Sequence, residues 1–512
     1  MDSKKKVHCL SFLDQQPHIR NFGRTLTIFP FPDVQRAHAA VSALRDGLAA
    51  TLEHFPHLAG TISLPDTTRN QLRLEYNEYV NTQNEANNVF NDSFDVATEA
   101  SFAYSTLSSS HFDPSLFPPQ IFCPKLLRHH SGLDDGDPYA MGRTNFANGV
   151  ALPVMAAQVA FIPGGLVISL WMHHAVADGL GATRLYEVWS GNVRVRSLGK
   201  APNMSTREER EEHTIDLSVL KGAMALDDLA RRSIPETKPT SPTPTPTATL
   251  HDLPYEVAAT LFRFTHSTII TLSIHLSNLT QTRISAFVAL AALLWAHAIR
   301  ARRIPHTFPT STLAVVVDLR SRLGAPFTHP DYTENCVLCA KPSTHLPSSL
   351  PTSGPITATD IAPLAHAIST SLTNCTATTI QARLATLIRS PTSPPAIDCQ
   401  DLRFANGPDM YITDWRRIGV DNEWDVPGTS SSKPVAIRRA CWKGEGGIVV
   451  LPRRRGDGAD WEVMVSLGEG DGRRLGVGLR GDGWVVEEGG GEEEVGVGVE
   501  VEVEVEQGRA RL

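Results

Sequence analysis

The chain has 512 residues, of which 41% are hydrophobic and 20% charged, an ordinary globular composition. A single hydrophobic core does not grow to this size, so two domains of about 200 residues or more are expected. The formal net charge of -8 argues against a nucleic-acid partner. Nine Glu and two Arg in residues 487–512 account for most of that charge, so the rest of the chain is close to neutral.

The seven cysteines are an odd, scattered set. The close pair Cys336 and Cys339 has no second pair to complete a zinc site, so no bound metal is expected. Reduced thiols in a cytoplasmic compartment fit this usage best. No apolar run follows the N-terminal lysines to form a secretory signal, and the longest apolar run is too short for a bilayer, so no membrane partner is expected.

In chain order, three stretches predict regular structure. From residue 43 onward the apolar spacing is that of an amphipathic helix that ends before Pro56. Residues 166–172 are short, apolar and preceded by two glycines, which predicts a buried strand. Residues 284–299 form a continuous apolar run typical of a buried helix.

A stretch rich in Pro and Thr divides the chain. Residues 233–250 cannot join a helix or a central strand and should be extended. We therefore expect an N-terminal domain over residues 1–232, a crossover linker over 233–250 and a C-terminal domain over 251–486. Residues 487–512 are predicted to be an acidic low-complexity tail, because Glu and Gly bury little apolar surface.

The most informative motif is H-H-x-x-x-D-G at residues 173–179. His174 falls at the end of the predicted strand, where a rigid scaffold gives way to a loop and reactive side chains usually lie. A neutral imidazole can take a proton from an alcohol or amine and return it, so His174 is a candidate general base. Asp178 either folds back to the imidazole or points away and locks the loop. Gly179 permits a backbone angle or a close approach that a side chain would block, and His173 is interpreted as structural.

Two other chemistries fit the motif less well. The chain contains no G-x-S-x-G elbow, which argues against a serine hydrolase. His173, His174 and Asp178 are all possible metal ligands, but their spacing matches no standard zinc pattern. We therefore expect the nucleophile to come from the substrate.

These residues resemble the BAHD family of acyl-CoA-dependent acyltransferases, in its fungal branch of trichothecene 3-O-acetyltransferase-like enzymes. His174, Asp178 and Gly179 match the family hallmark H-x-x-x-D-G. Further matches lie in family order along the chain. They are Leu10 to Asp14 (L-S-x-x-D), the helix-like segments at residues 43–60 and 284–299, Asp318 to Leu323 (D-x-R-x-R-L), and Tyr332 to Asn335 (Y-x-G-N with one substitution).

The family's D-F-G-W-G signature is where this sequence departs. Only Asp425 and one glycine remain, in Asp425-Val426-Pro427-Gly428. The residues from Lys433 to Arg438 resemble the K-P-x-x-V-R continuation of that signature. Since this loop shapes the fold and the CoA channel in the family, the departure affects the expected CoA affinity and loop geometry more than the base.

The resemblance implies an α/β fold of the two-domain chloramphenicol-acetyltransferase-like type. Each half is a mixed sheet with flanking helices, and the site lies in a channel between the halves. It also implies direct transfer, in which His174 deprotonates an acceptor hydroxyl or amine that attacks the thioester carbonyl. In the family the equivalent of Asp178 faces away from the site and pairs with an arginine, here Arg320.

The remaining site residues follow from the resemblance as well. Gly179 and Asp425 have supporting roles. Lys433, Arg438 and Arg439 are candidates for a basic patch that binds the CoA phosphates, and a solvated face of the protein is the alternative role of these three residues. Acyl-CoA, acetyl-CoA by analogy, is the expected co-substrate, with no resident cofactor. The expected acceptor is a secondary-metabolite alcohol or amine, and the expected enzyme is a monomeric acyltransferase of groups other than aminoacyl groups.

Two alternatives of function stay open. A condensation-domain-like enzyme carries the same motif and takes its acyl group from a carrier-protein thioester, but we expect such an enzyme to have an adjacent carrier segment, which the 512 residues do not contain. A non-catalytic small-molecule-binding protein on the same fold would explain the eroded loop at Asp425. For location, the alternative to the cytoplasm is the peroxisome, because Ala510-Arg511-Leu512 resembles relaxed forms of its C-terminal address.

Overall fold

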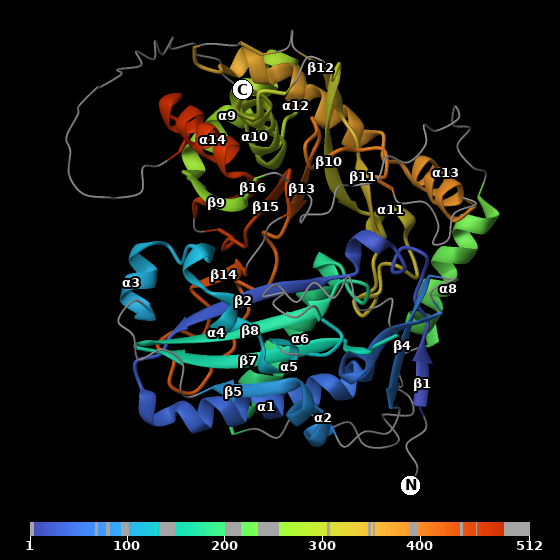
Figure 1. Ribbon diagram of the computed structural model, residues 1–512, viewed down its shortest axis with the longest axis vertical. Helices are drawn as coiled ribbons and strands as arrows, with labels where there is room; N and C mark the ends of the chain where they lie inside the picture. The colour runs from blue at the N-terminus through green and yellow to red at the C-terminus, as the bar shows by residue number, and fades with distance from the viewer. Residues whose placement is uncertain are drawn as a thin grey trace, which may run out of the picture.

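Two sheet-based bodies lie one above the other in this computed structural model, with helices packed on their outer sides (Figure 1). The structure describes residues 5–66, 70–77, 82–93, 102–128, 130–133, 149–199, 217–233, 255–304, 308–346, 350–351, 354–389, 398–440, 444–456 and 458–485. The predicted tail, the residues from Ala510 to Leu512, and the predicted linker beyond Ser233 lie outside the described residues. The domain boundaries therefore stay a prediction.

The lower body is built on a five-stranded mixed sheet. One pair, β5 with β7, is parallel and the other pairs are antiparallel. The α1 and α6 helices bury apolar side chains in the same core as this sheet. The strand order is β14 (Ala436–Arg439), β2 (Phe22–Pro30), β8 (Gly165–His173), β7 (Met155–Ile162) and β5 (Phe90–Ser93), and the helices are α1 (Ala37–His54) and α6 (Gly179–Ser197).

The upper body contains a seven-stranded mixed sheet with its own core. Its central strands, β10, β13 and β15, run parallel, and the outer pairs are antiparallel. The path is β11 (Val337–Ala340), β10 (Thr310–Asp318), β13 (Met410–Asp414), β15 (Gly447–Val450), β16 (Trp461–Gly468) and β9 (Val257–Phe264), with β12 (Ser343–His345) on β10. The helices around it are α9 (His266–Thr280), α10 (Ala286–Arg302), α12 (Ala358–Thr373) and α14 (Glu469–Gly481).

A third, small sheet is antiparallel throughout and was not predicted. Its order is β1 (Lys5–His8), β4 (Gln71–Asn77), β3 (Thr61–Asp66) and β6 (Leu152–Pro153). The remaining helices are α2 (Thr82–Val89), α3 (Tyr104–Ser109), α4 (Pro119–Phe122), α5 (Lys125–Arg128), α8 (Leu217–Arg232), α11 (Arg320–Leu323) and α13 (Ala377–Ile388). Short 3-10 turns cover Pro17–Ile19, Val34–Arg36, Pro56–Ala59 and Pro114–Leu116.

All three sequence-predicted elements are present. The strand expected at residues 166–172 is β8, and every residue of it is buried. The helix expected from residue 43 is α1, which begins six residues earlier and ends before Pro56. The apolar run at 284–299 is α10, capped at its start by the Ser285 hydroxyl, which accepts from the Val288 N–H. Among the helices that the structure describes, none combines the length and apolarity needed to span a bilayer.

The second half of the chain contributes a strand to the lower sheet, which the predicted division into two consecutive domains did not anticipate. β14 comes from the second half of the chain but pairs with β2 in the lower sheet, with Arg438 opposite Leu26 and Arg439 opposite Thr25. The segment around Trp424 also packs in the lower core. The second half of the chain therefore completes the sheet that carries His174.

Candidate active site

His174 directly follows β8, and its backbone is held on both sides. Its N–H donates to the carbonyl of Asn21 at 2.8 Å. The side-chain amide of Asn335 donates to its carbonyl at 2.8 Å. The residue is partly exposed, while Nδ1 of its ring is buried. A fixed backbone thus holds a half-buried imidazole at the place where a loop of the upper body meets the lower sheet.

The electrostatic surroundings keep this imidazole uncharged. Burial lowers the pKa of His174, and this outweighs the nearby Asp178 carboxylate, which acts in the opposite direction. The positive charge of Arg439 lowers the pKa further. A neutral ring at physiological pH is the form that can accept a proton from an alcohol or amine.

The neighbouring His173 lies in the core, in agreement with the structural role expected for it from the sequence. It is fully buried, and its Nδ1 accepts a hydrogen bond from the Ala175 N–H at 3.3 Å. Its ring packs edge-on against Phe22, with 5.4 Å between centroids. Burial lowers the pKa of His173 to about 3, so it remains neutral and serves packing.

Asp178 is turned toward the upper body and away from the imidazole. Its carboxylate receives the guanidinium of Arg320 at 2.9 and 3.1 Å. The same carboxylate caps α6 by accepting the N–H groups of Leu180 and Gly181, both at 3.0 Å. It also accepts the N–H of Cys336 at 3.0 Å. Of the two orientations left open by the sequence, the structure has the one that locks the loop.

Arg320 is buried and held from several directions. Besides Asp178, it donates to Asp318 at 2.7 Å and to the carbonyls of Tyr332 and Glu334 at 3.3 and 2.7 Å. Burial works against its charge, but the Asp178 carboxylate raises the pKa of Arg320 above its ordinary value. Removing one partner of such a buried pair costs about 3–5 kcal/mol, since the other charge is left without compensation.

Gly179 was expected to allow an unusual backbone angle or a close approach, but the structure requires a glycine at Gly181 instead. Gly179 does not have a positive φ, and a Cβ built on it would meet no atom within 4 Å. A Cβ on Gly181 would collide with the carbonyl oxygen of Thr333. The close approach of the two bodies therefore occurs two residues later than expected, on the first turn of α6. The second glycine in Gly179-Leu180-Gly181 was the available signal.

Asp425 supports the fold at a distance from His174. Its carboxylate accepts from Nε of Arg194 at 2.9 Å, and its backbone is left-handed, with φ 47°. Arg194 lies sixteen residues after Asp178 along the α6 helix, which is about 24 Å at 1.5 Å per residue. The loop also contains Gly428 at φ 94°, where a Cβ would collide with the ring of Phe31.

Lys433 and Arg438, two of the three candidate phosphate ligands, are placed differently. Lys433 is partly exposed, and within the described part of the chain the structure shows no ion pair for it. Arg438 is buried, and its guanidinium donates to the carbonyls of Phe112, His111 and Ile437 and to the carboxylate of Glu462. Since His111 and Phe112 belong to the lower body and Glu462 to the upper body, Arg438 joins the two bodies. These acceptors take most of its N–H groups, so Arg438 is not a phosphate ligand.

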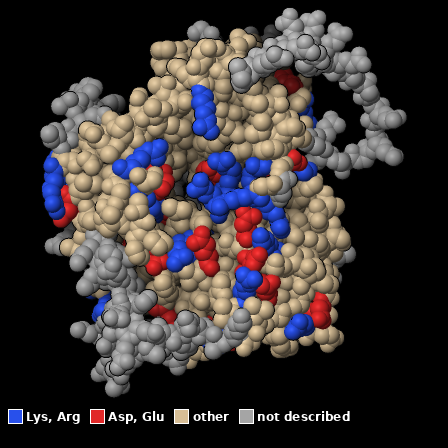
Figure 2. All heavy atoms as spheres, turned by 180° about the vertical axis from the view of Figure 1, so that it is seen from behind, with Lys and Arg blue, Asp and Glu red and all other residues tan. Residues whose placement is uncertain are grey.

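Arg439, the third candidate, ends β14, and two arginines that the sequence analysis did not assign, Arg416 and Arg453, follow the ends of β13 and β15. The guanidiniums of Arg416 and Arg453 both lie 4.8 Å from the ring of Trp461, and that of Arg439 lies 5.0 Å from the ring of Trp415. Figure 2 shows Lys and Arg side chains gathered near the middle of one face of the molecule. The available signal was the two basic runs at residues 416–417 and 453–455.

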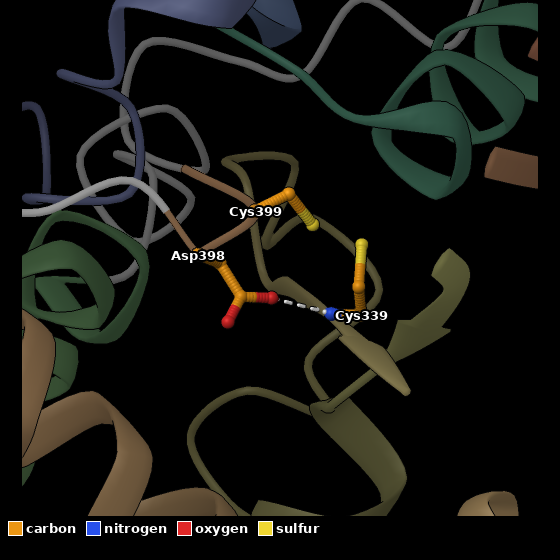
Figure 3. A group of neighbouring side chains, drawn as sticks. All are labelled: Cys339, Asp398 and Cys399. Carbon is orange, nitrogen blue, oxygen red and sulfur yellow. Dashed lines mark hydrogen bonds between the residues drawn. The ribbon is translucent and has the colours of Figure 1, made fainter. Parts of the chain in front are cut away.

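One group of side chains in the described residues has the atoms to bind a metal ion. The thiols of Cys339 and Cys399 and the carboxylate of Asp398 lie within 4.8 Å of one another (Figure 3). Both carboxylate oxygens are already used, because Arg383 donates to one at 2.6 Å and the Cys339 N–H to the other at 2.7 Å. With three ligands and a guanidinium beside them, the group is a poor fit to a tetrahedral zinc site.

Comparison with known proteins decides the family. Residues 143–473 match the model of the Transferase family, and residues 22–193 match the trichothecene 3-O-acetyltransferase-like N-terminal domain. The chain belongs to the Transferase (BAHD) family. This confirms both the resemblance and its fungal branch.

Curated relatives of this BAHD protein are fungal acyltransferases. "Acyltransferase easC" of Emericella nidulans is 25% identical over 480 residues, which cover 89% of this chain and 90% of the relative. "Eremophilane O-acetyltransferase ORF8" of Penicillium roqueforti is 25% identical over 413 residues, or 76% and 81% of the two chains. The prediction of an acyl-transferring enzyme is confirmed.

Solved structures show the same fold. TRI101 of F. sporotrichioides, complexed with coenzyme A and T-2, superposes with a TM-score of 0.69 at 17% identity over 95% of this chain and 100% of that one. Vinorine synthase superposes with a TM-score of 0.57 at 16% identity over 94% of each chain. The predicted two-body α/β fold of the chloramphenicol-acetyltransferase-like type is therefore confirmed.

Proposed function

We propose that this BAHD enzyme transfers an acetyl group from acetyl-CoA directly to a hydroxyl or amine of a small secondary metabolite, with His174 as the general base. The observation that carries the proposal is the half-buried, uncharged imidazole of His174, fixed by its backbone beside the pair of Asp178 and Arg320. The names of the relatives, which include eremophilane O-acetyltransferases, favour a hydroxyl acceptor.

The proposed reaction uses the outer nitrogen of the ring. Because Nδ1 is buried, we assign Nε2 to the proton transfer. The acceptor oxygen attacks the thioester carbonyl carbon while its proton passes to Nε2 of His174. The tetrahedral intermediate then breaks its C–S bond, and the CoA sulfur takes the proton back from Nε2. The products are the acetyl ester and free CoA, and His174 is again neutral.

The basic residues near Trp461, which are Arg416, Arg453 and Lys433, provide a site for the phosphates of the donor. The guanidiniums of Arg416 and Arg453 lie 4.8 Å from the ring of Trp461, although Arg416 also pairs with the carboxylate of Asp414. Lys433, which has no ion pair in the described residues, lies in the loop that Arg454 contacts at Pro434. Guanidinium groups favour phosphate because their geometry allows two parallel hydrogen bonds. Solved relatives of this fold hold coenzyme A, as TRI101 does. We further propose that the enzyme is a cytoplasmic monomer without a resident cofactor.

The test measures release of the CoA thiol from acetyl-CoA, with product mass, over a panel of terpenoid alcohols and amines. His174→Ala should lower kcat by about 100-fold to 10,000-fold, the range of general-base catalysis, while its melting temperature is unchanged. His275→Ala, on an exposed position of α9, is the matched control and should behave as wild type.

Other outcomes would favour the alternatives. Acylation with a carrier-protein thioester, and none with acetyl-CoA, would indicate the condensation-domain-like reaction. Binding of the alcohols with equal and negligible turnover by the wild type and His174→Ala would indicate a binding protein. Either result would overturn the proposal.

A further inference from the structure

A buried carboxylate lies two hydrogen bonds away from His174. Asp14 is fully buried, and its Oδ1 accepts the backbone N–H of Asn335 at 2.8 Å and the side-chain amide of Asn335 at 2.9 Å. That same amide nitrogen donates to the carbonyl of His174 at 2.8 Å. Oδ2 of Asp14 is held by the N–H and the hydroxyl of Ser11, at 2.8 and 2.7 Å. Asp14 thus fixes the amide that fixes the His174 backbone.

The three residues come from separate parts of the chain. Asp14 lies between β1 and β2, His174 follows β8, and Asn335 belongs to the loop of the upper body that precedes β11. The next residue in that loop, Cys336, donates its N–H to Asp178. Two consecutive residues of the upper body therefore grip the H-x-x-x-D segment at both ends.

We propose that Asp14 and Asn335 are positioning residues for His174, and that they hold it only while Asp14 is ionised. The inference rests on the proposed role of His174 as general base. Neither side chain touches the reacting atoms. They act by fixing the backbone from which the imidazole projects, and displacements of about 1 Å in such a frame cost roughly 100-fold in rate.

A second carboxylate makes the charge of Asp14 sensitive to pH. Glu334 is 1% exposed, and its Oε1 lies 3.2 Å from Nε2 of His8. Burial and the negative charge of Glu334 raise the pKa of Asp14 to about 7, against the hydrogen bonds from Ser11 and Asn335. Glu334 occupies the glycine position of the family's Y-x-G-N motif, so this sensitivity is a property of this chain.

The other groups around Asp14 do not provide a strong counter-charge. The negative charge of Asp14 raises the pKa of the thiols of Cys9 and Cys336 and of the Tyr332 phenol. Asp227 acts on Cys9 from α8, and His57 stacks on His8 with 4.5 Å between ring centroids. Two groups that can be cationic lie beside Glu334: His8 pairs with its carboxylate, and the guanidinium of Arg320, which is paired with Asp178, donates to its carbonyl.

Protonation weakens the bonds that matter. As a carboxylate, Asp14 accepts four hydrogen bonds, and bonds to an ionised acceptor are about twice as strong as neutral ones. As pH falls through about 7, Asp14 gains a proton, its hold on Asn335 loosens and the rate falls. His174 itself has a lowered pKa and titrates at lower pH, so an acid limb near 7 belongs to Asp14.

The kinetic test compares pH profiles of kcat for acetyl-CoA turnover. Wild type should show an acid limb near pH 7. Asp14→Asn should abolish that limb and lower kcat by about tenfold or more, with KM for acetyl-CoA unchanged. Asn335→Ala should cause a similar loss of kcat. Glu334→Gln should move the limb to lower pH, because it removes the charge that raises the pKa of Asp14.

Asp409→Asn is the matched control. Asp409 is also buried and also accepts backbone N–H groups, those of Thr312 and Arg403 at 2.8 Å each, but it lies in the upper body and makes no bond to Asn335 or His174. This variant should lose stability and keep the wild-type limb. An unchanged limb in both Asp14→Asn and Glu334→Gln would overturn the proposal.

A readout without turnover separates this inference from the proposed function. In protein labelled with 13C-histidine, the His174 signal is the one missing from His174→Ala. In wild type it should shift with a midpoint near pH 7, and in Glu334→Gln at lower pH. If the His174 signal is insensitive to Glu334→Gln and Asp14→Asn, the positioning role of Asp14 and Asn335 is overturned even if acetyl transfer is active. If the His174 signal shifts with pH as expected but the protein transfers no acetyl group, the positioning role is supported and the acetyl-transfer proposal is overturned.

Discussion

The segment from His174 to Gly181 and the loop from Trp424 to Lys433 stand where the family has its two signatures, but they are built differently. In the first, Asp178 is tied to Arg320 and to three backbone N–H groups, all at 3.1 Å or less. In the second, the ion pair of Asp425 with Arg194 is half exposed. Few residues can replace a buried carboxylate with this many partners, whereas the half-exposed ion pair in the loop restricts the sequence less.

The loop is held by an aromatic residue and a glycine, although most of the family's signature is absent from it. Trp424 is fully buried, and its backbone N–H donates to the carbonyl of Ser432 at 2.7 Å. The ring of Trp424 packs against those of Phe29 and Trp189. Gly428 holds a positive φ against Phe31. An aromatic anchor and one glycine thus replace the lost signature, so the eroded motif does not by itself indicate a degraded channel.

Asp178→Ala should break the first segment and give the largest effect. It leaves the buried Arg320 without a counter-charge and removes the cap of α6, at a cost of about 3–5 kcal/mol in the free energy of unfolding. Activity should fall as well, since the loop after His174 loses its anchor. Denaturant unfolding and kcat measure the two effects. His174→Ala is the contrast, because it should lose activity and keep stability.

Gly181→Ala sharpens the comparison within the first segment. The added methyl meets the Thr333 carbonyl oxygen, and such overpacking costs about 1–3 kcal/mol. Gly179→Ala, at an open position on the first turn of the helix, should instead stabilise by about 0.4–1 kcal/mol. Thermal unfolding of the two variants side by side measures the difference. Equal losses would show that the bodies do not meet at Gly181.

Asp425→Asn probes the second segment and should have the smallest effect. Its ion pair with Arg194 has exposures of 32% and 48% for the two side chains, and exposed pairs contribute about 0–1 kcal/mol. Asparagine also tolerates the left-handed backbone of this position. Stability and kcat/KM for acetyl-CoA should both stay near wild type. A tenfold loss of kcat/KM would indicate that Asp425 contributes to donor binding and not only to the fold.

Elements with a strong local pattern could be predicted from the sequence. β8 and α10 are continuous apolar runs, and both were found close to their observed bounds. The pair of Asp178 and Arg320 followed from the resemblance, since nothing in the spacing of two residues 142 positions apart indicates a contact.

The features that were missed depend on long-range packing. β14 has four residues, two of them arginines, and no apolar alternation that would assign it to the lower sheet. Arg438 was taken as a phosphate ligand because its charge is visible in the sequence, while the carbonyls that occupy it come from the distant residues His111 and Phe112. Asp14 was visible only as a motif letter, and its partner Asn335 lies 321 positions away.

The strand that the second half of the chain contributes to the lower sheet has a consequence for how the protein is made. β2 ends at Pro30, but its neighbour β14 is not synthesised until residue 439. The lower sheet therefore waits for most of the chain to leave the ribosome, with one edge of β2 unpaired in the meantime, and exposed edges of this kind favour aggregation. A fragment that stops at the linker would keep that edge open, so the halves should depend on one another for folding and be recovered together or not at all.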